Sequence, residues 1–315
     1  MEEVFHQSAK FDKSQLKNFK ERIDTPATQH LLFVLLLFVL ALYFLFEGLM
    51  HINILQLLIG IVFYVVVYCS SFAMLHETVH NTAFKTRWKN KIASQIAGVL
   101  QFYTPAMFSE FHFEHHRHTH ELGRDPEITV GKFQVPESLG SYSMYFAWIS
   151  GFPLFALKFT MLIAGALGMP EFMRASIFPF VNKKNRVKLF LDSWLVLIVY
   201  SFAVLFAIKI NTDLLYLLVL IPIANCVLAN YIIAEHGGLP HNGNIFEKTR
   251  SMKVNSFVKF VMWNMPYHAE HHAYPAIPFY QLPKVHEILS DEIIHKNETY
   301  SDVHLNGLKG KYFQH

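Results

Sequence analysis

Nine histidines recur at short, regular intervals in this sequence, and imidazole is the commonest metal-binding side chain in proteins. They form three clusters and one isolated position: His76, His80, His112, His115, His116, His236, His268, His271 and His272. On a helix, residues i and i+4 lie about 40° apart, so each cluster can aim its rings to one side. One tetrahedral zinc ion needs only four ligands. The pattern therefore predicts two first-row metal ions held side by side.

The first cluster leaves two alternatives open. His76 to His80 reads H-E-x-x-H, the zinc-protease pattern, in which Glu77 would act as general base. That pattern is short, and a protease needs only one further ligand, so most of the other clustered histidines stay unexplained. A metal transporter is the second alternative. Transporters hold ionisable ligands near the bilayer midplane, whereas these histidines lie beyond the apolar segments of the chain. Metal analysis separates an oxygenase with two irons from a protease with one zinc and a transporter with exchangeable metal.

Four apolar segments must position these histidines. They are His30–Phe46, Ile52–Met74, Leu189–Ile208 and Leu214–Ala234. Each has about 17–23 residues, enough for a helix to cross a hydrocarbon core of about 30 Å. Hydrophobic residues make up 52% of the chain, and the net charge of +3 is too small to indicate a nucleic-acid partner. The sequence predicts an all-α membrane protein with four transmembrane helices in two hairpins and a cytoplasmic helical cap that carries the histidines.

Lysine and arginine placement predicts the orientation of these spans. Five such residues precede the first span, thirteen lie between the second and third, and eight follow the fourth. The turn Glu47–His51 has none, and the turn after the third span has only Lys209. We therefore expect a multi-pass integral membrane protein with both termini and all nine histidines on the cytoplasmic side. The apolar stretches 92–107 and 142–169 are expected to lie in the interface or to dip part-way into the bilayer.

The positions of the spans and the histidine clusters predict a single domain, residues 1–315, with five parts. We expect a cytoplasmic N-terminal segment, a first hairpin, a cytoplasmic or interfacial region with the first two clusters, a second hairpin and a cytoplasmic C-terminal region with the last cluster. Their expected bounds are 1–29, 30–74, 75–188, 189–235 and 236–315.

Taken together, these motifs resemble those of the integral-membrane fatty acid desaturase family. That family has three histidine boxes, H-x(3–4)-H, H-x(2–3)-H-H and (H/Q)-x(2–3)-H-H. They are matched in order by His76–His80, His112–His116 and His268–His272. Placement after two transmembrane hairpins matches too. The resemblance covers about residues 30–290, and it is specific as a set although each box alone is weak.

The resemblance implies a non-haem centre of two iron ions that uses O2 to introduce a C=C bond into a lipid acyl chain. Iron suits this chemistry because imidazole binds it well and because zinc has no redox chemistry. The nine histidines are the expected metal ligands, with no further catalytic residue. The alternative is a hydroxylase or ketolase that acts on a fatty acid, a carotenoid or another lipid with the same centre.

Two further features bear on this resemblance. Acyl-CoA desaturases of the family carry an asparagine four residues before the isolated histidine, whereas this chain has Ile232 there and its nearest upstream asparagine is Asn230. The chain shows no haem-binding cytochrome b5 signature, and Cys69 and Cys226 are too few for an iron–sulfur cluster. We therefore expect a separate electron donor of the ferredoxin or cytochrome b5 type.

Carboxylates close to the clusters in sequence are expected to orient the rings by accepting their far N–H groups. The candidates are Glu77, Glu110, Glu114, Asp125, Glu235 and Glu270. The segment Arg124–Glu127 is interpreted either as a simple turn with an ion pair or as a device that fixes the second cluster. Four other histidines, His118, His120, His241 and His286, are expected to lie outside the ligand set.

Overall fold

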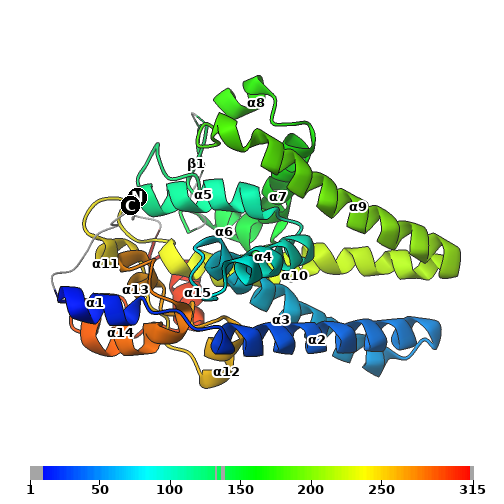
Figure 1. Cartoon of the computed structure of the whole chain (residues 1–315), viewed down its shortest axis with the longest axis horizontal. Helices are drawn as coiled ribbons and strands as arrows, with labels where there is room; N and C mark the ends of the chain where they lie inside the picture. Colours follow the sequence, from blue (N-terminus) through cyan, green and yellow to red (C-terminus); the bar gives the residue numbers. More distant parts are fainter. Residues whose placement is uncertain (1–9, 132, 136–138, 313–315) are drawn as a thin grey trace.

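Helices dominate the computed structural model, which describes residues 10–131, 133–135 and 139–312 (Figure 1). Four helical segments are long and apolar enough to cross a membrane: Thr25–Met50, Ile54–Val79, Lys183–Ile210 and Thr212–His236. The predicted all-α membrane fold with four transmembrane helices is therefore confirmed. Each segment is longer than predicted, because the helical backbone continues past the apolar stretch into the residues that flank it.

The first hairpin consists of α2 (Thr25–Met50) and α3 (Ile54–Val79). Two glycines allow these helices to approach closely. A Cβ atom at Gly48 would lie 2.8 Å from Leu57, and one at Gly60 would lie 2.7 Å from Leu45. Small residues are common where transmembrane helices pack together. The outward faces carry exposed apolar side chains, as expected for a surface that contacts lipid.

The second hairpin consists of η1 (Lys183–Asn185), α9 (Arg186–Ile210), η2 (Thr212–Val219) and α10 (Leu220–His236). Figure 1 shows the turns of both hairpins at one end of the molecule and the short helices gathered at the opposite end. The C-terminal ends of α3 and α10 therefore both reach the group of short helices. These two ends carry His76 and His236.

In its described residues, the segment between the hairpins forms α4 (Arg87–Gln101), α5 (Pro105–His118), β1 (Thr129–Val130), β2 (Phe133–Gln134), α6 (Tyr142–Ile149), α7 (Phe152–Ala166) and α8 (Glu171–Ser176). The short strands β1 and β2 pair antiparallel. Helices α6 and α7 are bent by 58° at the break between them. A pair bent this sharply is compatible with the part-way insertion predicted for residues 142–169, which stays a prediction.

Gly151 lies at this bend, where its backbone closely approaches the backbone of α10. Its φ is +72°, and a Cβ atom there would lie 2.4 Å from the backbone nitrogen of Cys226 on α10. A side chain at this position would therefore combine a left-handed backbone with a backbone clash.

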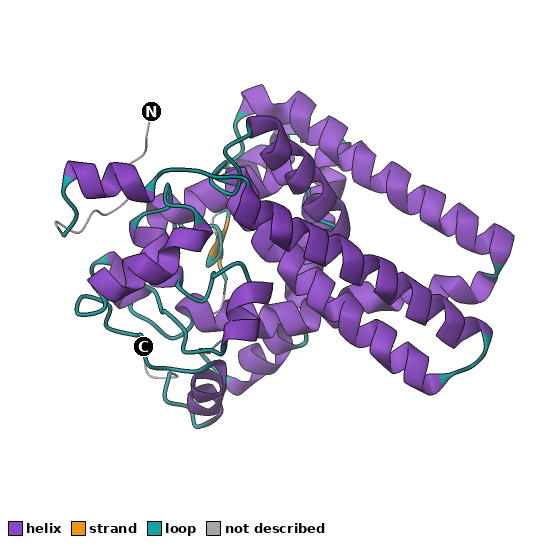
Figure 2. Ribbon diagram, turned by 60° about the horizontal axis from the view of Figure 1, so that its bottom comes forward, coloured by secondary structure: helices purple, strands orange, loops and turns teal. Residues whose placement is uncertain are grey.

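The remaining helices are α1 (Lys13–Phe19), α11 (Ile245–Lys248), α12 (Ser256–Val261), α13 (His268–Ala273), η3 (Phe279–Gln281), α14 (Leu282–Leu289) and α15 (Tyr300–Leu308). Figure 2 shows these short helices and their loops beside one end of the long helices. Asp24 ties the start of α2 to the start of α4. Its carboxylate accepts from the backbone N–H of Thr86 at 2.9 Å and from Nζ of Lys89 at 2.7 Å.

Candidate metal centre

All nine histidines singled out in the sequence meet in two neighbouring groups. The five-histidine group is His76, His80, His112, His116 and His271, and the four-histidine group is His115, His236, His268 and His272. Within each group, the candidate ligand nitrogens lie within 4.8 Å of one another. The rings of His116 and His272 stack with centroids 4.2 Å apart, so the two groups are in contact. The sequence predicted this convergence but not its division into five and four.

Helices α5 and α13 each supply candidate ligands to both groups. Helix α5 gives two to the five-histidine group and one to the other, whereas α13 gives one to the five-histidine group and two to the other. On α5, His112 and His116 are spaced i and i+4 and belong to the five-histidine group, whereas His115 belongs to the other. On α13, the i and i+4 pair His268 and His272 belongs to the four-histidine group. On each helix, residue i+3 (His115 or His271) lies about 60° from i in the direction opposite to i+4. Its ring therefore points away from the i and i+4 pair and joins the other group.

Helix ends place the other candidate ligands. His76 lies in the last turn of α3 and His80 is its C-cap, whereas His236 is the last residue of α10. The end of α10 is fixed by the buried guanidinium of Arg250, which donates to the carbonyl oxygen of Gly237 at 2.7 Å. Carbonyl groups at a helix C-terminus lack partners within the helix, so this cation satisfies one beside His236.

Three rings of the four-histidine group are oriented through Nδ1. His115 donates to Asp125 at 2.9 Å, and His236 donates to the carbonyl oxygen of Lys248 at 2.9 Å. Nδ1 of His272 lies 3.1 Å from the hydroxyl oxygen of Thr119. Because the partners of His115 and His236 only accept, their Nδ1 atoms carry the proton and their Nε2 lone pairs are available to a metal ion.

Asp125 is thus the carboxylate that fixes the second cluster. Two other predicted carboxylates lie near ring nitrogens at longer range. Oε1 of Glu235 is 3.5 Å from Nδ1 of His268, and Oε1 of Glu77 is 3.7 Å from Nδ1 of His76. Three other predicted carboxylates pair with residues outside the nine histidines. Glu110 accepts from Asn182 and Asn185, Glu114 pairs with Arg117 and His118, and Glu270 pairs with Ser251 and His286.

The four remaining histidines named above lie outside both groups. His118 contacts Glu114 and Glu121 at the surface, and Nδ1 of His286 contacts Glu270. His120 bonds through Nδ1 to the carbonyl oxygen of Pro240, and His241 bonds to the carbonyl oxygen of His120. The upstream Asn230 donates to the carbonyl oxygens of Ile149 and Cys226, so it faces α6 rather than the histidines.

Burial determines the charge of most of these rings. It lowers the pKa of His112, His271 and His272 well below the usual value, and neighbouring histidines lower it further. These rings are therefore neutral and keep a lone pair for a metal. At His115, burial lowers the pKa, but Asp125 and Glu127 outweigh it and raise the pKa to about 9. The same carboxylates would favour a metal cation bound to this ring.

Buried nitrogen atoms without partners show that the residues fit such ions. Both ring nitrogens of His76 and Nδ1 of His268 are buried and have no hydrogen-bond partner among the described residues. Nε2 of His80 lies 2.9 Å from Nε2 of His112, and Nε2 of His236 lies 2.9 Å from Nε2 of His268. Metal ions that accept one lone pair of His76 and those of the facing Nε2 atoms would give these buried nitrogens the partners that they require.

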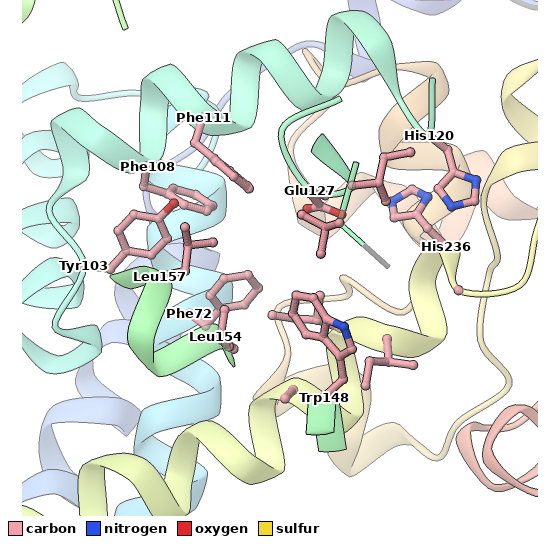
Figure 3. A pocket seen from close by; sticks show the side chains of 16 residues that line it. Phe72, Tyr103, Phe108, Phe111, His120, Glu127, Trp148, Leu154, Leu157 and His236 are labelled. Atoms are coloured by element: carbon pink, nitrogen blue, oxygen red, sulfur yellow. The ribbon is translucent and has the colours of Figure 1, made fainter. Parts of the chain in front are cut away.

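An apolar cavity of about 130 Å³ lies beside the histidines. Figure 3 shows His236 and His120 at one end, Tyr103 and Phe108 at the other, and Glu127 between them on the side of the histidines. The walls between them include Phe72, Phe111, Trp148, Leu154, Leu157 and Ile232. An aliphatic chain in this cavity would therefore lie against hydrophobic side chains with one end near the four-histidine group.

Sequence reasoning missed several groups that hold the site together. The carbonyl oxygen of Lys248 and the buried Arg250 carry no signal in the sequence, because a backbone acceptor is available at every residue. Thr119 lies between His118 and His120 in the sequence, and its residue type alone does not indicate a contact with His272. Its Oγ1 donates to the carbonyl oxygen of His115 at 3.0 Å, so it accepts from His272.

Four membrane-length helices that deliver two buried groups of histidines define a membrane-embedded protein with a candidate two-metal centre. A family model described as fatty acid desaturase matches residues 52–304, and the chain therefore belongs to the fatty acid desaturase family. This match includes all nine histidines, helix α3 and the whole second hairpin, and it begins just after the end of α2. No curated protein matches the chain. Membership implies an oxidoreductase that acts on lipid in a membrane.

Proposed function

We propose that the protein is an O2-dependent lipid desaturase that introduces a C=C bond into an acyl chain. The observation that carries this proposal is the pair of buried histidine groups beside an apolar cavity, in a chain of the fatty acid desaturase family. Two iron ions would be held by His76, His80, His112, His115, His116, His236, His268, His271 and His272. No other side chain is assigned a catalytic role.

The iron pair, when bound, supplies the redox chemistry with O2 that removes hydrogen from two adjacent methylene groups. The chain's own residues contribute position and environment. Asp125 and the carbonyl oxygen of Lys248 hold His115 and His236 in the tautomer that presents Nε2. Apolar walls such as Phe111 and Ile232 exclude water and hold one C–C bond of the substrate near the histidines.

The proposal includes the orientation of the protein in the membrane. The histidines and the short helices lie at the end of the molecule opposite to the hairpin turns (Figure 1). The excess of lysine and arginine lies on this side, so we assign it to the cytoplasm. A separate donor of the ferredoxin or cytochrome b5 type would deliver electrons there. Cysteine labelling at the hairpin turns and at the C-terminal region would measure this orientation.

Expression of the full chain in a host, followed by lipid profiling and metal analysis, tests the proposal. We expect two irons per chain and a new unsaturated lipid that is absent from the His271→Ala variant. His51→Ala is the matched control, because His51 lies in a hairpin turn and its side chain is 69% exposed. One zinc per chain, or an unchanged product in His271→Ala, would refute the proposal. A hydroxylated or keto product would assign the alternative activity to the same centre.

A further inference from the structure

The two ends of the cavity beside the histidines differ in chemistry. One end carries His236, Glu127 lies on the side of that end, and the middle is apolar. At the opposite end Tyr103 presents a polar group, as Figure 3 shows. A plain hydrocarbon end would give this group no partner.

The hydroxyl of Tyr103 is the unusual atom at that end. The residue is 4% exposed, and its hydroxyl has no hydrogen-bond partner among the described residues. An edge-to-face contact with Phe108, with centroids 5.1 Å apart, helps to hold the ring in place. A buried polar group without a partner destabilises the protein, so a structure that keeps it there calls for a ligand atom to pair with it.

A buried lysine lies behind Tyr103. Lys158 is 1% exposed, and its ammonium lies 5.8 Å from the centre of the Tyr103 ring. It donates to the hydroxyl of Tyr68 at 3.2 Å and to Oε1 of Gln101 at 2.9 Å. No carboxylate of the described segments forms an ion pair with it in the structure. When it is protonated, Lys158 therefore favours an electron-rich atom beside the Tyr103 ring.

We infer that the cavity accepts a lipid with an oxygen function at the chain end that it buries, and that Tyr103 recognises this oxygen. The hydroxyl of Tyr103 donates to a hydroxyl, carbonyl or carboxylate oxygen, and Lys158 behind it stabilises the partial or full negative charge. This inference rests on the proposed function, because it takes the cavity as the substrate site. It names the substrate class as chains that are oxygenated at both ends.

Equilibrium binding to the full chain in lipid nanodiscs tests this without turnover. The probes are hexadecanoic acid, 16-hydroxyhexadecanoic acid and hexadecanedioic acid. We expect the wild-type protein to bind at least one of the two doubly oxygenated probes about three- to tenfold more tightly than hexadecanoic acid, as one added hydrogen bond implies. In Tyr103→Phe this preference should fall to about one.

The control is Tyr43→Phe, because Tyr43 lies on the outward face of α2 and is 55% exposed. This variant should keep the wild-type preference. The variant Lys158→Met should weaken the preference for the dicarboxylic acid more than that for the hydroxy acid. Equal binding of all three probes to the wild type, or a preference retained in Tyr103→Phe, overturns the inference. Either result leaves the proposed desaturase open to its own test, because iron content and product are measured separately.

Discussion

Asp125 holds His115 through Nδ1, on the side of the ring opposite to Nε2, the candidate ligand atom. Its two carboxylate oxygens lie 3.0 and 2.9 Å from Nδ1 of the ring. The same carboxylate accepts the backbone N–H groups of His120 at 2.6 Å and Glu127 at 2.9 Å. One buried side chain therefore fixes both the ring and the loop that follows α5.

Replacing Asp125 with Asn should reduce iron content and turnover by about 10- to 100-fold, the usual effect of losing a partner of a metal-binding histidine. The amide removes the negative charge and can present an N–H group to Nδ1, which then competes with the tautomer that binds metal. Iron per chain and product formed per chain measure the effect. Glu114→Gln is the control, because Glu114 pairs with Arg117 and His118 away from the two groups. Wild-type iron content in Asp125→Asn would contradict the assigned role.

Substitutions in the two histidine groups should separate the two metal sites. His271→Ala removes a candidate ligand from the five-histidine group, and His272→Ala removes one from the four-histidine group. Each should abolish turnover and lower iron from two toward one per chain, since the remaining group keeps its rings. His118→Ala should be milder, because that ring contacts only surface carboxylates. Full turnover in His271→Ala or in His112→Ala would defeat the ligand assignment.

Gly151 should tolerate no side chain. Gly151→Ala and Gly168→Ala share a left-handed backbone, with φ of +72° and +73°, which costs about 1–2 kcal/mol for an L-residue. Only Gly151 also meets a neighbouring backbone, whereas a Cβ atom at Gly168 meets nothing within 4 Å. Gly151→Ala should therefore lower the free energy of unfolding by about 1–3 kcal/mol more than Gly168→Ala. Thermal unfolding in detergent measures the difference, and equal melting temperatures would show that the bend adapts.

Asp24 should make the anchor of α2 sensitive to acid. Hydrogen bonds from Lys89 and Thr86 hold the pKa of Asp24 well below its ordinary value of 3.8. A lowered pKa in the folded state contributes stability above pH 3.8, and this contribution is lost as the pH falls below that value. The stability difference between the wild type and Asp24→Asn should therefore shrink below about pH 4. Melting temperatures of both proteins between pH 3 and 7 would check this, and a constant difference would exclude Asp24 as the titrating group.

The sequence predicted most of the fold because long apolar runs leave few alternatives in a membrane. It predicted the four spans and the convergence of the histidines, since spacing on a helix fixes which rings share a face. Span ends were less accurate. Helix α3 continues from the apolar stretch through His76 to Val79, as expected for residues that follow the span directly, and Thr78 donates to the carbonyl oxygen of Met74 within the helix.

The partners of the rings were predicted only in part. Sequence proximity correctly selected Asp125, but it gave equal weight to Glu110, whose carboxylate accepts from Asn182 and Asn185 instead. Distant pairs such as Lys158 on α7 and Gln101 at the end of α4 come together only in the folded protein. Such contacts depend on three-dimensional packing, which one sequence does not encode in any local pattern.

Helices α5 and α13 each serve both histidine groups, and this has a consequence for the length of the two segments. One residue added between His112 and His116, or between His268 and His272, would turn the following rings by about 100°. Both histidine groups would then lose candidate ligands at once, from either helix. Insertions and deletions in these five-residue stretches are therefore far more damaging than point changes, and the two sites can be maintained only as a unit.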